Sequence, residues 1–177
     1  MSPTPRTLSL DCGGGGIKGC VLDGSGELLC PPVRHPTPYP LPPQLFVTVL
    51  REIGDGLPAA DRLTVGLPGM IRHGRVVTTP HYITRRGPRS AVDPTLVAQW
   101  SGFDARAALA AEFERPVLVL NDAEVHGAGA VSGSGLELVL TLGTGLGCAL
   151  FDNGRLAPHL EMSRALVRGG LPFDLYM

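Results

Sequence analysis

Short apolar runs dominate the chain, and most of them are bounded by Gly, Pro or Asp within a few residues. Apolar runs of this length between turn-forming residues are typical of β-strands. Asp23-Gly24 stands between two of these runs and favours a hairpin turn over 23–26. The strands predicted in this way are 8–10, 17–22, 27–29, 63–67, 76–79, 117–120, 138–142 and 147–151.

Apolar residues recur at helical spacing between several of these strands. The clearest case is 44–53, and an alanine-rich helix is predicted over 105–113. Asp93 followed by Pro94 is a good helix start, because Asp caps the first turn and Pro fits it. A further helix is predicted over 122–131. Strands that alternate with helices, with hairpins mixed in, predict an α/β domain with a mixed central sheet and sites at strand ends.

Seven prolines lie in the segment from Pro31 to Pro43. Proline cannot continue a helix or donate within a central strand, so the segment is predicted to be an extended connection. Proline-rich segments also serve as polyproline ligands of other proteins. Both interpretations fit this stretch of the sequence.

Composition narrows the class of protein. The 177 residues are 44% hydrophobic and 18% charged, with a net charge of −1, which suits a folded domain with a real core. The absence of a basic bias argues against a nucleic-acid partner. No apolar run reaches transmembrane length, and residues 1–6 lack the apolar stretch of a signal peptide. We therefore expect a cytoplasmic protein with no membrane partner.

Two glycine-rich loops follow apolar strands, at 13–16 and 143–147. Glycine lets backbone N–H groups approach an anion closely, so two such loops indicate a phosphate bound from two sides. Asp11, just before the first loop, could hold a hydrated Mg²⁺ against that phosphate. The alternative for Asp11 is a turn-forming role. Lys18 lies close enough in sequence to contact the same phosphate.

Two further features have chemical potential. Asn121-Asp122 stands where a buried strand becomes a helix, and the carboxylate there could accept a proton from an attacking hydroxyl. The alternative is that one of the pair simply caps the helix. Five arginines also gather between positions 72 and 89, where they form either a patch for a polyanion or an ordinary solvated loop. These are Arg72, Arg75, Arg85, Arg86 and Arg89.

Several of these segments together resemble the ROK family of sugar kinases and sugar-binding regulators, within the actin-like ATPase superfamily. The segment 11–18, DCGGGGIK, resembles the first phosphate motif of the family, DIGGTGIK. The segment 65–69, VGLPG, together with Thr79-Pro80-His81, resembles VGxPG…TxPN. The sequence NDAE at 121–124 resembles the catalytic motif NDAD.

The likeness continues toward the C-terminus. Residues 140–147, LTLGTGLG, match the second phosphate motif, and 154–161 resemble the segment that ends in a sugar-contacting Glu. The matches follow the family order from about residue 8 to 161, and they are most similar to the polyphosphate glucokinase branch. The resemblance implies a ribonuclease-H-like, actin-like ATPase fold. It also implies two domains, 1–122 and 123–177, the second of them incomplete because family members run on further.

The resemblance also implies an activity and a set of site residues. The activity is that of a hexokinase/glucokinase-type phosphotransferase, which transfers a phosphoryl group from ATP or polyphosphate to a hexose, glucose above all, with Mg²⁺. Asp122 would be the general base. The sugar-binding residues would be Asn121, Glu161, Gly69 and His81. The phosphate-binding residues would be Asp11, Gly13, Gly14, Gly15, Gly16, Lys18, Gly143, Thr144 and Gly145.

The sequence departs from the family pattern at three of its motifs. Gly15 replaces the usual Thr, His81 replaces Asn, and Arg164 replaces the His of the segment after Glu161. The loss of one hydroxyl donor to phosphate would cost about 1.5–3 kcal/mol if nothing replaced it. The cysteine-rich zinc motif of some relatives is missing, so no zinc is expected. An incomplete second domain would expose core surface, which favours a homodimer.

Three rival functions deserve comparison with the kinase. A catalytically degenerate sugar- or phosphate-binding remnant would bind without turnover, and Gly15 and Arg164 favour it. A ROK transcriptional repressor needs a helix-turn-helix before the first strand, and we expect none here because that strand begins by about Thr7. A dinucleotide-binding dehydrogenase fits poorly, since no helix and acidic ribose ligand follow the first loop at the required spacing.

Overall fold

The computed structural model describes residues 4–142, 145–160, 162, 166 and 170. The chain divides into two compact units, Met1–Leu120 and Asn121–Met177, which we call the first and second units. Each unit is built around its own sheet, and each is described by itself below. No helix within the described ranges is long and apolar enough to cross a membrane.

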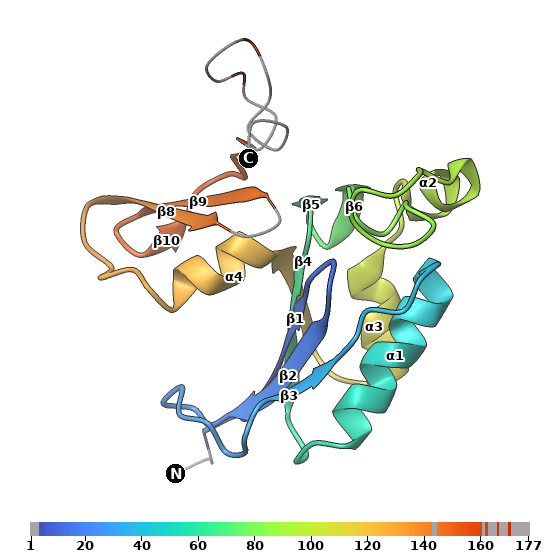
Figure 1. The fold of residues 1–177 in the computed structure, drawn as a ribbon. Coiled ribbons are helices and arrows are strands. Elements are labelled where there is room, and N and C mark those ends of the chain that lie inside the picture. Colours follow the sequence, from blue (N-terminus) through green and yellow to red (C-terminus); the bar gives the residue numbers. More distant parts are fainter. Residues whose placement is uncertain (1–3, 143–144, 161, 163–165, 167–169, 171–177) are drawn as a thin grey trace. The chain divides into compact units, whose positions relative to one another are not determined.

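The first unit contains a mixed β-sheet. Strand β1 pairs with β2 in the antiparallel sense and with β4 in the parallel sense, so the sheet is mixed, as the sequence predicted. Among the described residues the sheet has five strands, with β3 at one edge (Figure 1). In spatial order they are β3 (Val33–His35), β2 (Ile17–Leu22), β1 (Thr7–Cys12), β4 (Arg62–Leu67) and β7 (Val117–Asn121).

Helices and a small hairpin complete the first unit. Helix α1 buries its apolar stripe, and the Asp104 carboxylate accepts a hydrogen bond from the Ala107 N–H at the start of α3. Helices α1 and α3 contact each other and lie side by side in Figure 1. These elements are α1 (Pro43–Asp55), α2 (Pro94–Trp100), α3 (Ala105–Phe113), β5 (Met70–Arg72) and β6 (Arg75–Thr78).

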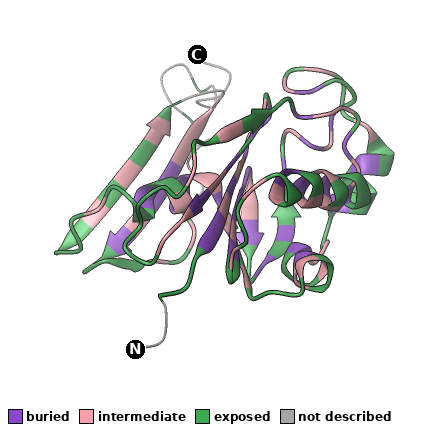
Figure 2. Ribbon diagram, turned by 90° about the horizontal axis from the view of Figure 1, so that it is seen from below, coloured by how far each residue is buried: buried purple, intermediate pink, exposed green. Residues whose placement is uncertain are grey.

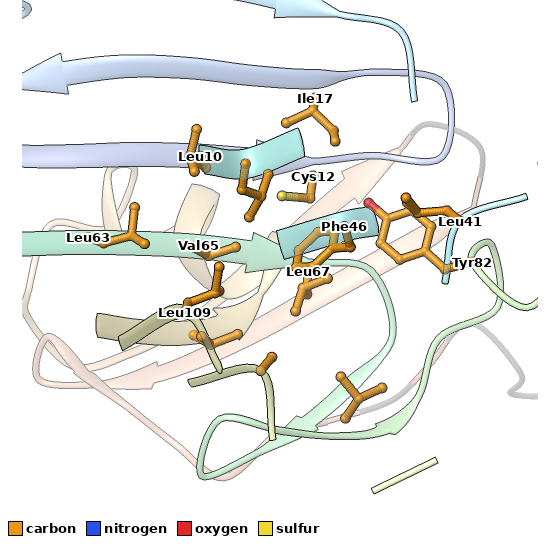
Figure 3. Packing of buried hydrophobic residues seen from close by; sticks show 14 of the residues in the cluster. Leu10, Cys12, Ile17, Leu41, Phe46, Leu63, Val65, Leu67, Tyr82 and Leu109 are labelled. Carbon is orange, nitrogen blue, oxygen red and sulfur yellow. The ribbon is translucent and has the colours of Figure 1, made fainter. Parts of the chain in front are cut away.

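The core of the first unit lies on the sheet strands and continues into an aromatic cluster. Most residues of β1 and β4 are buried, and Figure 2 shows buried stretches along the strands of the sheet. Figure 3 shows Leu10 and Val65 among them. Beyond the strand ends Phe46, Tyr82 and Trp100 pack with ring centroids 5.3–5.8 Å apart. The indole N–H of Trp100 donates to a backbone carbonyl at 2.8 Å, so the buried ring has its polar atom satisfied.

One strand prediction is wrong. Residues 27–29 form only an isolated bridge between Leu22 and Leu28. The third strand is instead Val33–His35, inside the proline-rich segment. It is short and lies at the sheet edge, where neighbouring prolines are tolerated because one side of the strand needs no hydrogen bonds. After this strand the segment runs on to α1, and Leu41 within it is fully buried, which supports the prediction of a connection.

In the described part of the second unit, helix α4 packs against a three-stranded antiparallel sheet. Gly127 packs directly against the Phe151 ring, and a Cβ at position 127 would stand 2.7 Å from that ring. The helix ends at Ala128, earlier than predicted. The elements are α4 (Asp122–Ala128), β8 (Leu136–Leu142), β9 (Leu146–Asp152) and β10 (Arg155–Leu156), in the spatial order β10-β9-β8.

The other face of this sheet carries exposed leucines. Residues of β8 are alternately exposed and intermediate along the strand (Figure 2). The exposed positions share a face, because side chains two residues apart in a strand point the same way. We call this surface the leucine face. It comprises Leu136, Leu138, Leu140 and Leu142, which are 49–73% exposed.

Candidate functional site

The first glycine loop is the turn of the β1–β2 hairpin. Cys12 and Ile17 are cross-strand partners, so residues 13–16 make the whole connection, which we call the glycine loop. The Gly13 N–H donates to the Gly16 carbonyl at 2.9 Å and closes it. Gly15 is exposed at the tip, and nothing lies within 4 Å of the position a Cβ would take there.

Three hydroxyl groups hold the glycine loop through its carbonyl oxygens. Thr37 and Tyr82 donate to the Gly13 carbonyl at 2.7 and 3.4 Å, and Tyr39 donates to the Gly14 carbonyl at 2.8 Å. Burial raises the pKa of Tyr39 to about 12, so this phenol stays a donor at neutral pH. Because carbonyl oxygens repel anions, binding them with hydroxyls both fixes the loop and lowers its negative potential.

Asp11 and Lys18 face each other beside the glycine loop. They are cross-strand partners, and the Lys18 ammonium lies 3.1 Å from the Asp11 carboxylate. The Asp11 side chain is 24% exposed and that of Lys18 is 57% exposed, so both remain accessible. A partly exposed carboxylate at a strand end suits a hydrated Mg²⁺ held through its waters, because that ion keeps most of its water shell.

The structure brings His81 to the glycine loop. A Cβ added to Gly14 would stand 3.0 Å from the His81 ring and 2.7 Å from Pro88. Only glycine therefore fits at position 14 without movement. His81, which the sequence assigned to the sugar, thus lies against a residue assigned to the phosphate.

Gly69 occupies a strained turn in the same unit. Its φ of +103° lies in a region that other residues avoid, and a Cβ would meet the Thr78 carbonyl and the Thr79 backbone. Glycine at position 69 thus lets the chain after β4 lie directly on the segment that leads to His81. The two parts of the predicted sugar motif are therefore packed together.

In the second unit, the Asn121-Asp122 pair begins helix α4. The Asn121 side chain caps the helix, and its Oδ1 accepts from the Ala123 N–H at 2.9 Å. Asp122 is the first helical residue, and its Oδ1 accepts from the same N–H at 2.9 Å. Asn121 is therefore a helix cap, as one alternative held, and this role fixes the backbone that carries the Asp122 carboxylate.

Glu124 joins this helix start to a later loop. Its Oε2 accepts from the Asn121 N–H at 2.9 Å, which completes a capping box. Its Oε1 lies 2.9 Å from Nδ1 of His159, and the two side chains are only 5% and 8% exposed. A carboxylate only accepts, so the His159 Nδ1–H is the donor. The buried Glu124 carboxylate thus connects the start of α4 to the segment that carries His159.

Part of the predicted site falls outside the described residues. Gly143, Thr144 and Glu161 lie outside the described residues, as does Arg164. Gly145 is described and forms a bend before β9. In the described part of the chain, no group of three or more His, Cys, Asp and Glu side chains could hold a metal ion directly.

Sequence reasoning missed the residues that support the site. A signal existed for Glu124, because Asn121-x-x-Glu124 before a helix is a capping-box pattern. No local signal existed for Tyr39 and Tyr82, which reach the glycine loop from 25 and 69 residues away in sequence. Periodicity and turn chemistry do not report contacts of that range.

The chain is similar to known sequences and solved structures. The sequence profile of the ROK family matches residues 7–158. A polyphosphate glucokinase of Mycobacterium tuberculosis (strain CDC 1551 / Oshkosh) is 34% identical over 171 residues, which are 92% of this chain and 59% of that protein. One from Mycobacterium leprae is 32% identical and is covered over 49% of its length. The chain thus spans half to three fifths of these relatives.

Solved structures give the same picture. The inorganic polyphosphate/ATP-glucomannokinase of Arthrobacter sp. strain KM superposes with a TM-score of 0.77 and 31% identity, over 96% of this chain and 66% of that one. A ROK family glucokinase of Streptomyces griseus, solved with glucose and AMPPNP, has a TM-score of 0.67, 21% identity and coverage of 96% and 49%. This second likeness shows the fold alone.

Proposed function

This chain belongs to the ROK family, and we propose that it transfers a phosphoryl group from ATP or polyphosphate to a hexose, glucose in the first place. The observation that carries the proposal is the fixed Asn121-Asp122 pair at the start of α4. Phosphoryl transfer asks mainly for positioning and charge stabilisation, which this cap and the anchored glycine loop supply. Phosphoryl transfer to a hexose is also the activity for which the polyphosphate glucokinase and the glucomannokinase among the relatives are named.

Each predicted residue has a role in this proposal. The Asp122 carboxylate takes the proton from the attacking sugar hydroxyl. The glycine loop with Lys18, and Gly143, Thr144 and Gly145 in the second unit, hold the phosphates. The residues that bind sugar hydroxyls or shape the sugar site are Asn121, Glu161, Gly69 and His81.

Mg²⁺ fits the proposal through Asp11. A single carboxylate beside the glycine loop matches an ion that binds one protein group, several waters and substrate phosphates. When bound there, Mg²⁺ neutralises charge on the phosphates. In its presence Asp11 orients the water shell and Lys18 contributes a second positive charge.

A second candidate is a binding remnant without turnover. The open space at Gly15 favours it, because the hydroxyl that the family motif places there has no substitute within 4 Å of that position. The remnant would bind sugar or phosphate through the same residues. Turnover is the property that separates the two candidates.

The decisive experiment is a phosphorylation assay of the purified chain. Glucose, mannose and N-acetylmannosamine are each offered with ATP or polyphosphate and Mg²⁺, with Asp122→Asn as the catalytic variant. The kinase requires turnover that Asp122→Asn lowers by several orders of magnitude while the fold stays intact. Sugar or phosphate binding without turnover in the wild-type chain would establish the remnant instead.

A further inference from the structure

We propose that a rim of cationic side chains beside the glycine loop binds the distal phosphates of an inorganic polyphosphate chain. The inference rests on the proposed function and names which donor the site is built to hold. The rim extends the phosphate-binding region over the surface of the first unit. It consists of Lys18, Arg34, Arg85, Arg86 and Arg89, all of them exposed.

One side of the rim is a row across three strands. Asp11 pairs with Lys18, and Lys18 pairs with Arg34. Directly opposed residues of neighbouring strands point to the same face of a sheet. The row ends at the glycine loop, because Nε and Nη2 of Arg34 lie 3.0 and 3.4 Å from the position a Cβ on Gly16 would take.

The other side of the rim is the loop of residues 85–91, which we call the arginine loop. It packs on the glycine loop, where Pro88 lies against Gly14, and on the Tyr39 ring, which a Cβ on Gly87 would approach to 3.1 Å. Tyr39 itself donates to the Gly14 carbonyl. The arginine loop is therefore in contact with the structure that binds the first phosphates.

The arginine loop is ordered by its own hydrogen bonds. The Arg85 N–H donates to the Ala91 carbonyl at 3.0 Å, and Ser90 Oγ accepts from the Arg86 N–H and donates to the Gly87 carbonyl. Asp93 lies 3.5 Å from the Arg85 guanidinium. Such a loop presents its arginines from a fixed backbone, which lowers the entropy lost on binding a chain ligand.

Charge separates this surface from the rest of the molecule. The rim holds five cations against the two carboxylates of Asp11 and Asp93, although the whole chain carries a net charge of −1. A nucleotide places its phosphates on the glycine loop and has an uncharged nucleoside beyond them. A polyphosphate chain continues with one negative charge per unit, so only this donor uses the cations that lie beyond the glycine loop.

The test is a binding measurement without sugar. Titration calorimetry at fixed ionic strength compares long-chain polyphosphate with tripolyphosphate, for the wild-type chain and for the double variant Arg86→Gln, Arg89→Gln. We expect the double variant to bind the long chain about tenfold more weakly and tripolyphosphate nearly as well. The salt dependence of long-chain binding should also fall by about one unit of slope per lost cation.

Arg115→Gln is the matched control. Arg115 is exposed and lines a cavity with Leu8 and Leu63 near the starts of β1 and β4. The glycine loop follows the other end of β1, roughly 20 Å away along the strand. We expect this control to bind both polyphosphates as the wild type does.

Four results would overturn the inference: failure of the wild-type chain to bind long-chain polyphosphate, unchanged binding in the double variant, equal loss for both ligand lengths, or the same loss in Arg115→Gln. Circular dichroism and thermal midpoints confirm that each variant is folded. Because no turnover is measured, the rim can be established in a catalytically silent chain. Conversely, if the rim did not bind polyphosphate, a kinase would still phosphorylate sugar in the activity assay, so the two proposals can fail independently.

Discussion

At the scale of single residues, a substitution of Tyr39 tests whether the hydroxyl groups that donate to the glycine-loop carbonyls stabilise the loop. Tyr39→Phe removes the hydroxyl that holds the Gly14 carbonyl and keeps the ring that packs under the arginine loop. We expect a loss of about 1 kcal/mol in the free energy of unfolding at neutral pH, together with weaker phosphate binding. Denaturant titration and phosphate titration of both proteins measure the two effects.

Tyr39 also predicts a pH dependence. Its pKa is raised from 10.0 to about 12 in the folded state, so the folded chain keeps a proton that the unfolded chain loses. The contribution to stability is full below pH 10.0 and is lost as the pH rises to about 12. The stability difference between wild type and Tyr39→Phe should shrink over this interval. A constant difference would show that the phenol is not buried as described.

Glu124 allows its two contacts to be separated. Glu124→Gln keeps an oxygen for the Asn121 N–H but places an amide against His159, whereas Glu124→Ala removes both contacts. We expect the Ala variant to lose about 2 kcal/mol of stability and the Gln variant about half of that. The exposed His126→Gln on the same helix is the control. Nitrogen shifts of His159 should report a changed tautomer in Glu124→Gln and an unchanged one in the His126→Gln control.

Gly15 offers a gain of function. Nothing lies within 4 Å of a Cβ there, and its backbone is not left-handed, so Gly15→Thr should leave stability unchanged. The added hydroxyl is expected to tighten phosphate binding by up to about tenfold, as a hydrogen bond to a charged group allows. Gly14→Ala should instead weaken binding, because its Cβ meets Pro88 and His81. Calorimetric titration with tripolyphosphate compares the two, and unchanged affinity in Gly15→Thr would show that the loop tip does not face the anion.

At the scale of elements, the leucine face of β8 predicts self-association. Leu138 and Leu140 are about half exposed, so lysine at both positions should cost little stability. Sedimentation of the chain should show association that the double Lys variant reduces, because exposed apolar patches associate. Ala149→Lys, which lies on the buried face, should unfold the second unit. A wild-type chain that stays monomeric at every concentration would contradict this expectation.

The elements also show what sequence patterns can and cannot predict. Strand 17–22 and helix 105–113 have the predicted bounds, because their apolar periodicity and flanking residues agree. The third strand was misplaced because Leu28 and Leu29 look apolar, yet pairing with β2 falls to Val33–His35 in a proline-rich segment. The segment that pairs with the edge of a sheet is the one that the rest of the fold brings next to it. The strand propensity of the segment itself does not determine this.

At the scale of the whole molecule, the fold class and most of the motif positions followed from the sequence. The glycine loop, the Asn121-Asp122 pair and the mixed sheet stand where the patterns placed them. The supporting contacts did not follow, since Thr37, Tyr39 and His159 act across long stretches of chain. The sequence therefore predicts where the site residues lie. It does not predict the contacts that hold them in place, because those come from side chains that are distant in sequence.

The anchoring of the glycine loop has a consequence for the order of folding. The β1–β2 hairpin closes through neighbours in sequence and needs only about microseconds to form. Tyr82, which also donates to Gly13, is made 69 residues later. During synthesis the turn would therefore exist as a flexible hairpin well before its anchors arrive. The glycine loop can therefore bind an anion in its anchored form only after residue 82 has been synthesised and Tyr82 has packed against Phe46 and Trp100.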